Sequence, residues 1–217
     1  MTSNTSLVIG ANGQIGKKLI QRMLETGITV KAMIRDPAQA EAFEAMGTEV
    51  IIADLEADFS FAFEGCDSVI FTAGSGASTG FDKTLLIDLW AAIKAINYAT
   101  EHDVRRFIMV SSRGAENPDK GPERIKPYLV AKHAADFVLL QSRLHYTILQ
   151  PGRLTDDPGT NHIQTQRPEN AAEQKISRDD VAESILYCLQ HDHTIGSSIE
   201  LFEGELGIEE ALSVLKS

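Results

Sequence analysis

The sequence contains little cysteine, a deficit of positive charge and no long apolar run. Cys66 and Cys188 are its two cysteines among 217 residues, which argues against a disulfide framework and indicates reduced thiols in a cytoplasmic protein. The apolar stretches are too short to span a bilayer, and residues 1–6 do not resemble a secretory signal. Lys and Arg number 20 against 31 Asp and Glu. We therefore expect neither a nucleic-acid nor a membrane partner.

Short apolar segments alternate with amphipathic segments along most of the chain, a pattern typical of a parallel sheet covered by helices on both faces. The expected strands are residues 7–9, 29–34, 49–53, 68–72, 107–110, 146–149 and 198–202. The expected helices are residues 14–26, 38–46, 83–102, 128–142, 178–190 and 208–216. The sequence thus predicts an α/β fold with a doubly wound parallel sheet, a three-layer αβα Rossmann domain over residues 1–217.

Other segments are expected to be irregular or to modify this plan. Residues 116–127 contain three prolines and predict a surface loop, and residues 153–177 predict a long polar loop with one short strand at most. Glycine and serine at 74–80 predict a mobile loop near a site. The apolar periodicity of the 83–102 helix places Leu86 and Trp90 near one face. Residues 153–217 are interpreted as a small substrate-side extension.

A glycine-rich turn joins the first expected strand to the first expected helix. Gly10, Gly13 and Gly16 recur every three residues. Glycine lets a ligand approach the backbone, and the free N–H groups at a helix start attract negative charge. The turn therefore predicts a dinucleotide diphosphate site, although a sharp turn that only helps the helix to pack is the alternative. The other residues expected to supply N–H groups or shape the turn are Asn12, Gln14 and Ile15.

Residues after the next strands are expected to meet the rest of the same cofactor. Arg35 stands where an acidic residue would bind a ribose 2′-hydroxyl, and a guanidinium there suits a 2′-phosphate, which favours NADP over NAD. Asp36 beside it either caps a helix or takes the ribose. Asp54, with the Leu55 N–H, either contacts the adenine or forms a plain turn. The residues expected to leave room for the ribose and diphosphate are Ala73, Gly74 and Ser75.

Tyr128 and Lys132 form the expected catalytic pair. They lie four residues apart on one expected helix, so both face the same way. A phenol normally titrates far above neutral pH, and a nearby ammonium favours the phenolate, which allows proton transfer at working pH. Lys132 would also hold the nicotinamide ribose, and Ser112 would hold the substrate oxygen. Pro151, after the sixth strand, would offer its backbone to the nicotinamide carboxamide or simply end the strand.

His191 and His193 flank Asp192, which superficially resembles a metal site. Because no further ligand lies nearby at suitable spacing, we expect a pair of cations at a helix end and no metal.

Taken together, the motifs resemble the short-chain dehydrogenase/reductase superfamily. Within it the chain looks like the atypical branch of single-domain NAD(P)-binding proteins, the biliverdin reductase B and flavin reductase type. The matching stretches are residues 7–16, 33–36, 107–112, 128–132, 146–152 and 177–182. The resemblance implies cofactor binding by Gly10, Gly13, Gly16 and Arg35, and an active-site set of Ser112, Tyr128 and Lys132.

Three functions remain open at this point. We expect first an NADP-dependent oxidoreductase that acts on a carbonyl, quinone or flavin-like small molecule. The alternatives are an NADP-sensing regulatory module without catalysis, motivated by the segments at 74–80 and 153–177, and a sugar-nucleotide epimerase or dehydratase. The short carboxyl-terminal part counts against the last. The chain is expected to be a monomer or a homodimer in which the 83–102 and 128–142 helices pair.

Overall fold

A computed structural model describes residues 5–76 and 79–214 and contains one large, mostly parallel sheet. Its seven parallel strands, in spatial order, are β3 (Glu49–Ile52), β2 (Thr29–Ile34), β1 (Thr5–Ile9), β4 (Ser68–Phe71), β5 (Arg106–Val110), β6 (His145–Pro151) and β10 (Ser197–Glu203). Strand order reverses between β1 and β4. In an open α/β sheet, ligands bind at the carboxyl ends of the strands beside such a reversal.

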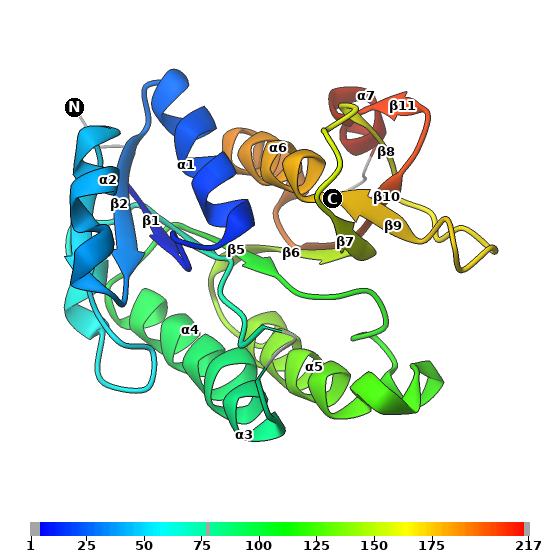
Figure 1. Ribbon diagram of the computed structural model, residues 1–217, viewed down its shortest axis with the longest axis horizontal. Coiled ribbons are helices and arrows are strands. Elements are labelled where there is room, and N and C mark those ends of the chain that lie inside the picture. The colour runs from blue at the N-terminus through cyan, green and yellow to red at the C-terminus, as the bar shows by residue number, and fades with distance from the viewer. Residues whose placement is uncertain (1–4, 77–78, 215–217) are drawn as a thin grey trace.

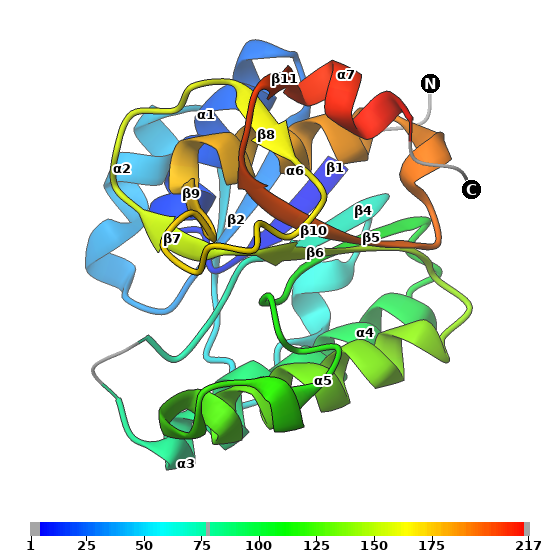
Figure 2. The ribbon, with the colours of Figure 1, turned by 90° about the vertical axis from the view of Figure 1, so that its right-hand side faces the viewer.

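Helices cover both faces of this sheet (Figures 1 and 2). One layer contains α1 (Gln14–Glu25), α2 (Ala40–Ala45) and α6 (Arg178–Gln190). The opposite layer contains α3 (Phe81–Lys83), a π-helical segment η3 (Thr84–Ala91), α4 (Ala92–Glu101) and α5 (Lys126–Leu140). Each layer buries its own apolar cluster against the sheet, so the expected doubly wound, three-layer architecture is confirmed.

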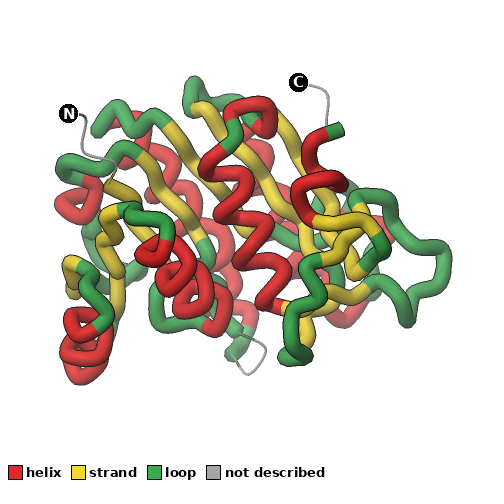
Figure 3. The backbone as a smooth tube through the Cα atoms, turned by 90° about the horizontal axis from the view of Figure 1, so that it is seen from above, coloured by secondary structure: helices red, strands yellow, loops and turns green. Residues whose placement is uncertain are grey.

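The expected loop at 153–177 is wrong in part, because it contains three short strands. β7 (Arg153–Thr155) and β9 (Lys175–Ser177) pair with each other in parallel. β8 (His162–Gln164) joins the main sheet antiparallel to β10, and β11 (Leu206–Gly207) pairs with β8 ahead of α7 (Ile208–Ser213). Viewed from above, these strands lie at the same end of the molecule (Figure 3). Their partners are distant in sequence, which the local pattern does not reveal.

The expected 83–102 helix is divided, and its predicted apolar face is wrong for Leu86 and Trp90. It begins at Phe81 and is π-helical over η3, which rotates the following residues relative to an ideal α-helix. Consequently Trp90 is 52% exposed and Leu86 38% exposed, whereas the intervening Asp88 is 1% exposed.

The segment before α5 is less irregular than expected. Two short 3₁₀ turns, η4 (Pro118–Lys120) and η5 (Glu123–Ile125), interrupt the expected loop. The helix begins two residues earlier than predicted, with Pro127 in its first turn, a position at which proline costs no hydrogen bond. A further 3₁₀ turn, η1 (Pro37–Gln39), replaces the start of the expected 38–46 helix. The expected mobile loop at 74–80 includes residues 77 and 78, which lie outside the described residues.

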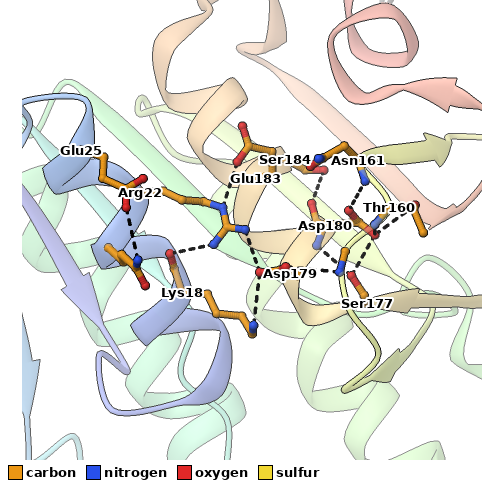
Figure 4. Close-up of polar contacts among 12 residues, drawn as sticks. Lys18, Arg22, Glu25, Thr160, Asn161, Ser177, Asp179, Asp180, Glu183 and Ser184 are labelled. Atoms are coloured by element: carbon orange, nitrogen blue, oxygen red, sulfur yellow. Dashed lines mark hydrogen bonds and ion pairs between the residues drawn. The ribbon is translucent and has the colours of Figure 1, made fainter.

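A charged cluster joins α1 to α6 (Figure 4). Asp179, in the first turn of α6, accepts hydrogen bonds from Arg22 at 2.7 Å and from Lys18 at 3.2 Å. Its neighbour Asp180 is buried and accepts hydrogen bonds from the backbone N–H groups of Thr160 and Asn161. Asp180 therefore holds the segment after β7 to the start of α6, and Asp179 connects α6 to α1, the helix that follows the glycine turn.

Both cysteines, and the two histidines that flank Asp192, make contacts within the fold. Cys66 and Cys188 are buried, and burial raises the pKa of Cys66 to about 11 and that of Cys188 to about 12. His191 stacks on Tyr187 at 3.9 Å between ring centroids, and His193 makes a ring-nitrogen contact with the carbonyl of Leu212. Across the described residues no cluster of three metal-type ligands occurs, and none of their helices is long and apolar enough to cross a membrane.

Candidate active site

The glycine turn has the close backbone approaches that only glycine permits. Gly10 has φ +89°, and a Cβ there would lie 2.7 Å from the backbone nitrogen of Ala73 at the end of β4. A Cβ on Gly16 would lie 2.5 Å from the carbonyl oxygen of Gly10. These contacts press the turn, the start of α1 and the end of β4 together. Gly10 and Gly16 thus have a physical requirement for glycine whether or not a ligand is bound.

The start of α1 leaves backbone donors free beside this turn. Gly13 occupies the N-cap position, and among the described residues no side chain caps the helix. Asn12, Gly13 and Gln14 are exposed at the start of the helix, where the first-turn N–H groups have no intrahelical partner. Uncapped donors at the positive end of a 12-residue helix fit a diphosphate. The residues present therefore suit a dinucleotide at this end of the sheet.

Two residues predicted to recognise the rest of the dinucleotide lie at the ends of β2 and β3. Arg35 is exposed immediately after β2. Asp36 accepts a hydrogen bond at 3.0 Å from the N–H of Ala38, so this carboxylate caps the 3₁₀ turn η1. Asp54 likewise accepts the N–H of Glu56 and so forms a turn, and its contact with an adenine stays a prediction. Leu55 is half-buried against the core.

Lys132 is the most confined cation of the candidate site. Its side chain is 3% exposed, and its Nζ lies 3.4 Å from Asp88 Oδ1, 3.2 Å from the carbonyl oxygen of Val110 and 5.8 Å from the ring centroid of Tyr128. Burial lowers the pKa of Lys132, but the charges of Tyr128, Asp88 and Asp136 outweigh burial and raise this pKa overall. Lys132 thus remains an ammonium beside the partly exposed Tyr128, as the sequence predicted from their spacing.

Two buried carboxylates that the sequence analysis missed surround this ammonium. Asp88 lies on η3, and its Oδ2 accepts the backbone N–H of Ser75 at 3.1 Å. Asp136, one turn after Lys132 on α5, accepts a hydrogen bond from Ser111 at 2.6 Å. Burial raises the pKa of Asp136, although its hydrogen bond from Ser111 and the charge of Lys132 oppose that rise. A lone aspartate inside the apolar run 85–90 was the available signal for Asp88.

The segment 73–75 lies close to this polar centre. Ala73 is buried against the glycine turn, and a Cβ on Gly74 would lie 3.1 Å from Asp88 Oδ1. The Asp88 carboxylate thereby connects the end of β4 to Lys132. These small residues lie beside the glycine turn and Asp88, and the room they leave for a ribose and diphosphate stays a prediction.

The two serines after β5 have different surroundings. Ser111 is buried and committed to Asp136, whereas Ser112 is half-buried and lines a cavity of about 530 Å³. Ser112 is thus the serine that lines the cavity, and its role in holding a substrate oxygen stays a prediction. Pro151 ends β6, is buried, and accepts the backbone N–H of Arg113. The ends of β5 and β6 are therefore held together at the rim of the cavity.

Comparison with known proteins supports a nucleotide-binding role. A family model described as NAD(P)H-binding matches residues 10–192. The uncharacterized sugar epimerase YhfK of Bacillus subtilis (strain 168) is 44% identical over 212 residues, which cover 96% of this chain and 98% of that protein.

Solved structures share the fold. A putative NAD-dependent epimerase/dehydratase from Bacillus halodurans is 40% identical, with a TM-score of 0.92 over 96% of this chain and 98% of that chain. ChuY, an anaerobillin reductase from Escherichia coli O157:H7, is 26% identical, with a TM-score of 0.75 over 93% and 98% of the two chains. The chain belongs to the NAD(P)H-binding family, and with its Rossmann sheet, glycine turn and these relatives it is an atypical short-chain dehydrogenase/reductase.

Proposed function

We propose that this protein is an NADP-dependent reductase of a small carbonyl, quinone or flavin-like acceptor. The observation that carries the proposal is the Tyr128–Lys132 pair on α5. The ammonium pairs with Asp88 and lies 5.8 Å from the centroid of the tyrosine ring. The buried ammonium lies near a partly exposed phenol, and Ser112 lines a cavity at the carboxyl end of β5, an arrangement that supports a catalytic site.

Each residue has a distinct part in this reaction. When bound, the nicotinamide supplies a hydride to the acceptor. Tyr128 gives its hydroxyl proton to the acceptor oxygen, and the nearby Lys132 charge stabilises the phenolate that remains. The Ser112 hydroxyl donates a hydrogen bond to the same oxygen and orients it. Lys132 also holds the nicotinamide ribose, for which its buried, fixed ammonium is suited.

The preference for NADP rests on Arg35. Its neighbour Asp36 is committed to capping η1, so the exposed guanidinium is the charged group that the end of β2 offers to a ligand. A 2′-phosphate pairs with guanidinium through two parallel hydrogen bonds, which a 2′-hydroxyl cannot do. Gly10, Gly13 and Gly16 take the diphosphate, Ala73, Gly74 and Ser75 border it, and Pro151 faces the carboxamide.

The test combines calorimetry with turnover. NADPH and NADH are titrated into the purified protein, and NADPH oxidation is then followed at saturating cofactor across quinones, flavins and aldehydes. We expect NADPH to bind at least tenfold more tightly than NADH and at least one acceptor class to be reduced. Binding without any consumption would replace the reductase by the NADP-sensing module, and no binding would remove both.

A sugar-nucleotide epimerase or dehydratase is the second candidate. It is favoured by the names of the Bacillus relatives, which match this chain over almost their full length. Such an enzyme returns the hydride to its substrate within one cycle. Conversion of a nucleotide sugar with no net change in NADPH absorbance would favour the epimerase, and stoichiometric NADPH loss favours the reductase.

A further inference from the structure

The cavity beside Ser112 differs in charge from the rest of the molecule. It lies between the loop that precedes α5 and the segment that links β8 to β9, both at the right of Figure 1. The chain as a whole has a net charge of −11. Yet five of the chain's 20 basic residues line the cavity, and among the described residues Glu116 is the one acidic residue that lines it. These five cations are Arg113, Lys120, Arg124, Arg153 and Arg167.

Two carboxylates neutralise only one of these cations. Arg167 pairs with Glu116 at 2.7 Å and also with Glu200. For the other four, Arg113, Lys120, Arg124 and Arg153, no ion pair with a carboxylate is formed by any residue that the structure describes. Their charge is therefore left for a bound anion or for solvent.

Arg113 is the best placed of the four. It is half-buried, and its Nη1 donates a hydrogen bond at 2.6 Å to the neutral amide oxygen of Gln174. Burial lowers the pKa of Arg113 most, and the charge of Arg167 lowers it as well. A bound anion would compensate for the lost hydration of this guanidinium and for the repulsion between neighbouring cations. A guanidinium anchored through one nitrogen keeps its other donors for bidentate contact.

Arg113 and Arg153 are also fixed relative to the reaction centre. Arg113 directly follows Ser112, and its backbone N–H is bonded to the carbonyl of Pro151. Arg153 follows Gly152, where a Cβ would lie 2.7 Å from the carbonyl oxygen of Gln174. These contacts hold the backbones of the two arginines at adjacent strand ends, and both side chains line the same cavity as Ser112.

We infer that the substrate of this site is a small organic anion whose carboxylate or phosphate is bound by Arg113 together with Arg153, with its reacting carbon at Ser112. The cavity volume of about 530 Å³ is in the range of small-ligand pockets, so an organic ligand has room there beyond its anionic group. This inference rests on the proposed function for the position of the reacting carbon, but the anion site itself can be measured separately.

A matched pair of aldehydes tests the inference during turnover. 4-Carboxybenzaldehyde and its neutral methyl ester are compared at saturating NADPH, in the wild type and in Arg113→Gln, Arg153→Gln and Arg143→Gln. Arg143 is a distant exposed arginine paired with Asp103 and serves as the control. We expect the wild type to prefer the acid by at least tenfold in kcat/KM. Arg113→Gln and Arg153→Gln should abolish this preference through KM, whereas Arg143→Gln should retain it.

Direct binding separates the anion site from catalysis. Terephthalate and neutral terephthalamide are titrated by calorimetry with and without saturating NADP, so that binding at the glycine turn is recognised. Terephthalate should bind at least tenfold more weakly to Arg113→Gln than to Arg143→Gln, with thermal melting as the check on folding. If neither aldehyde reacts but this difference appears, the anion site stands and the reductase does not. Equal treatment of acid and ester, together with terephthalate binding that is weak or insensitive to Arg113, overturns the inference.

Discussion

Asp88 Oδ1 lies 3.4 Å from Lys132 Nζ, and both side chains are almost completely removed from solvent. The carboxylate is on the π-helical segment η3, and the ammonium is on α5. Through its other oxygen, Asp88 also holds the N–H of Ser75. One carboxylate thereby fixes the lysine of the candidate catalytic pair and the strand end at which a dinucleotide would lie.

Asp88→Asn should leave the Lys132 charge buried without its nearest counter-ion. Breaking a buried pair on one side typically costs about 3–5 kcal/mol, and because Asp136 remains nearby we expect about 2–4 kcal/mol from urea unfolding. Asp103→Asn, which removes an exposed ion pair, is the matched control and should unfold like the wild type. Wild-type stability of Asp88→Asn would mean that the pair contributes nothing net.

The same substitution should alter the pH dependence of turnover. Negative neighbours raise the pKa of Lys132 above 10.5, so the ammonium is lost only as the pH rises through that higher value. Without Asp88 the opposing effect of burial gains weight, and the alkaline limb of kcat should move to lower pH. A limb that does not move would show that Lys132 ionisation does not limit the reaction.

Tyr128→Phe should remove the proton donor and leave cofactor binding intact. General acid catalysis is typically worth about 10²- to 10⁴-fold, so we expect kcat for a carbonyl acceptor to fall within that range. The Kd for NADPH, measured by calorimetry, should change by less than about twofold because the ring remains. Phe137→Tyr, an exposed change on the same helix, controls for general effects. An unchanged rate would exclude Tyr128 from the mechanism.

Arg35→Ala should reduce the discrimination between the two cofactors. Loss of a bidentate, charge-assisted contact to the 2′-phosphate costs about 1.5–3 kcal/mol, or about 10- to 150-fold in NADPH affinity. NADH lacks that phosphate, and its Kd should be nearly unchanged. If both dinucleotides weaken equally, Arg35 shapes the site without reading the phosphate.

Features whose cause is local could be predicted from the sequence. Glycine at positions 10 and 16 indicates a turn in which the backbone leaves no room for a side chain. Tyr128 and Lys132 lie four residues apart, so they share a helix face wherever nearby the helix begins. Alternation of apolar and amphipathic segments was sufficient for the parallel sheet and its two helix layers. The order of these signals, more than any one of them, determined the fold class.

Features that depend on distant partners were missed. Asp88 is buried because η3 is π-helical and shifts its facing residues, whereas a regular 3.6-residue period places Leu86 and Trp90 inward. Strand β8 exists because β10 and β11 lie beside it. The basic cavity likewise combines residues 113–124 with residues 153–174, and neither segment has a distinctive pattern alone.

Gly10→Ala should be far more damaging than an equivalent change elsewhere. Its new Cβ would meet the backbone of Ala73 at 2.7 Å in addition to the strain of a positive φ. Gly65, with φ +68° and open space around it among the described residues, carries the strain alone. We expect a loss of about 1–2 kcal/mol for Gly65→Ala and roughly 3 kcal/mol or more for Gly10→Ala in chemical unfolding. Equal losses would show that the close approach relaxes easily.

Asp179→Asn should weaken the contact between α1 and α6 in a pH-dependent way. Burial raises the pKa of Asp179, but the hydrogen bonds from Arg22 and Lys18 and the charge of Arg22 lower it by more than burial raises it. The pKa therefore lies below the ordinary 3.8. A carboxyl whose pKa is depressed on folding stabilises the protein above its unfolded pKa, and this contribution disappears as the pH falls through the folded value. We therefore expect Asp179→Asn to lower the free energy of unfolding by about 1 kcal/mol at pH 7, because it removes one partly buried carboxylate from the charged cluster. This loss should shrink toward zero below pH 3.8. Asp156→Asn, which removes the pair of an exposed carboxylate with Arg178, should have little effect at either pH. A difference between wild type and Asp179→Asn that does not diminish in acid would assign the effect to packing, because in acid position 179 is uncharged in both proteins.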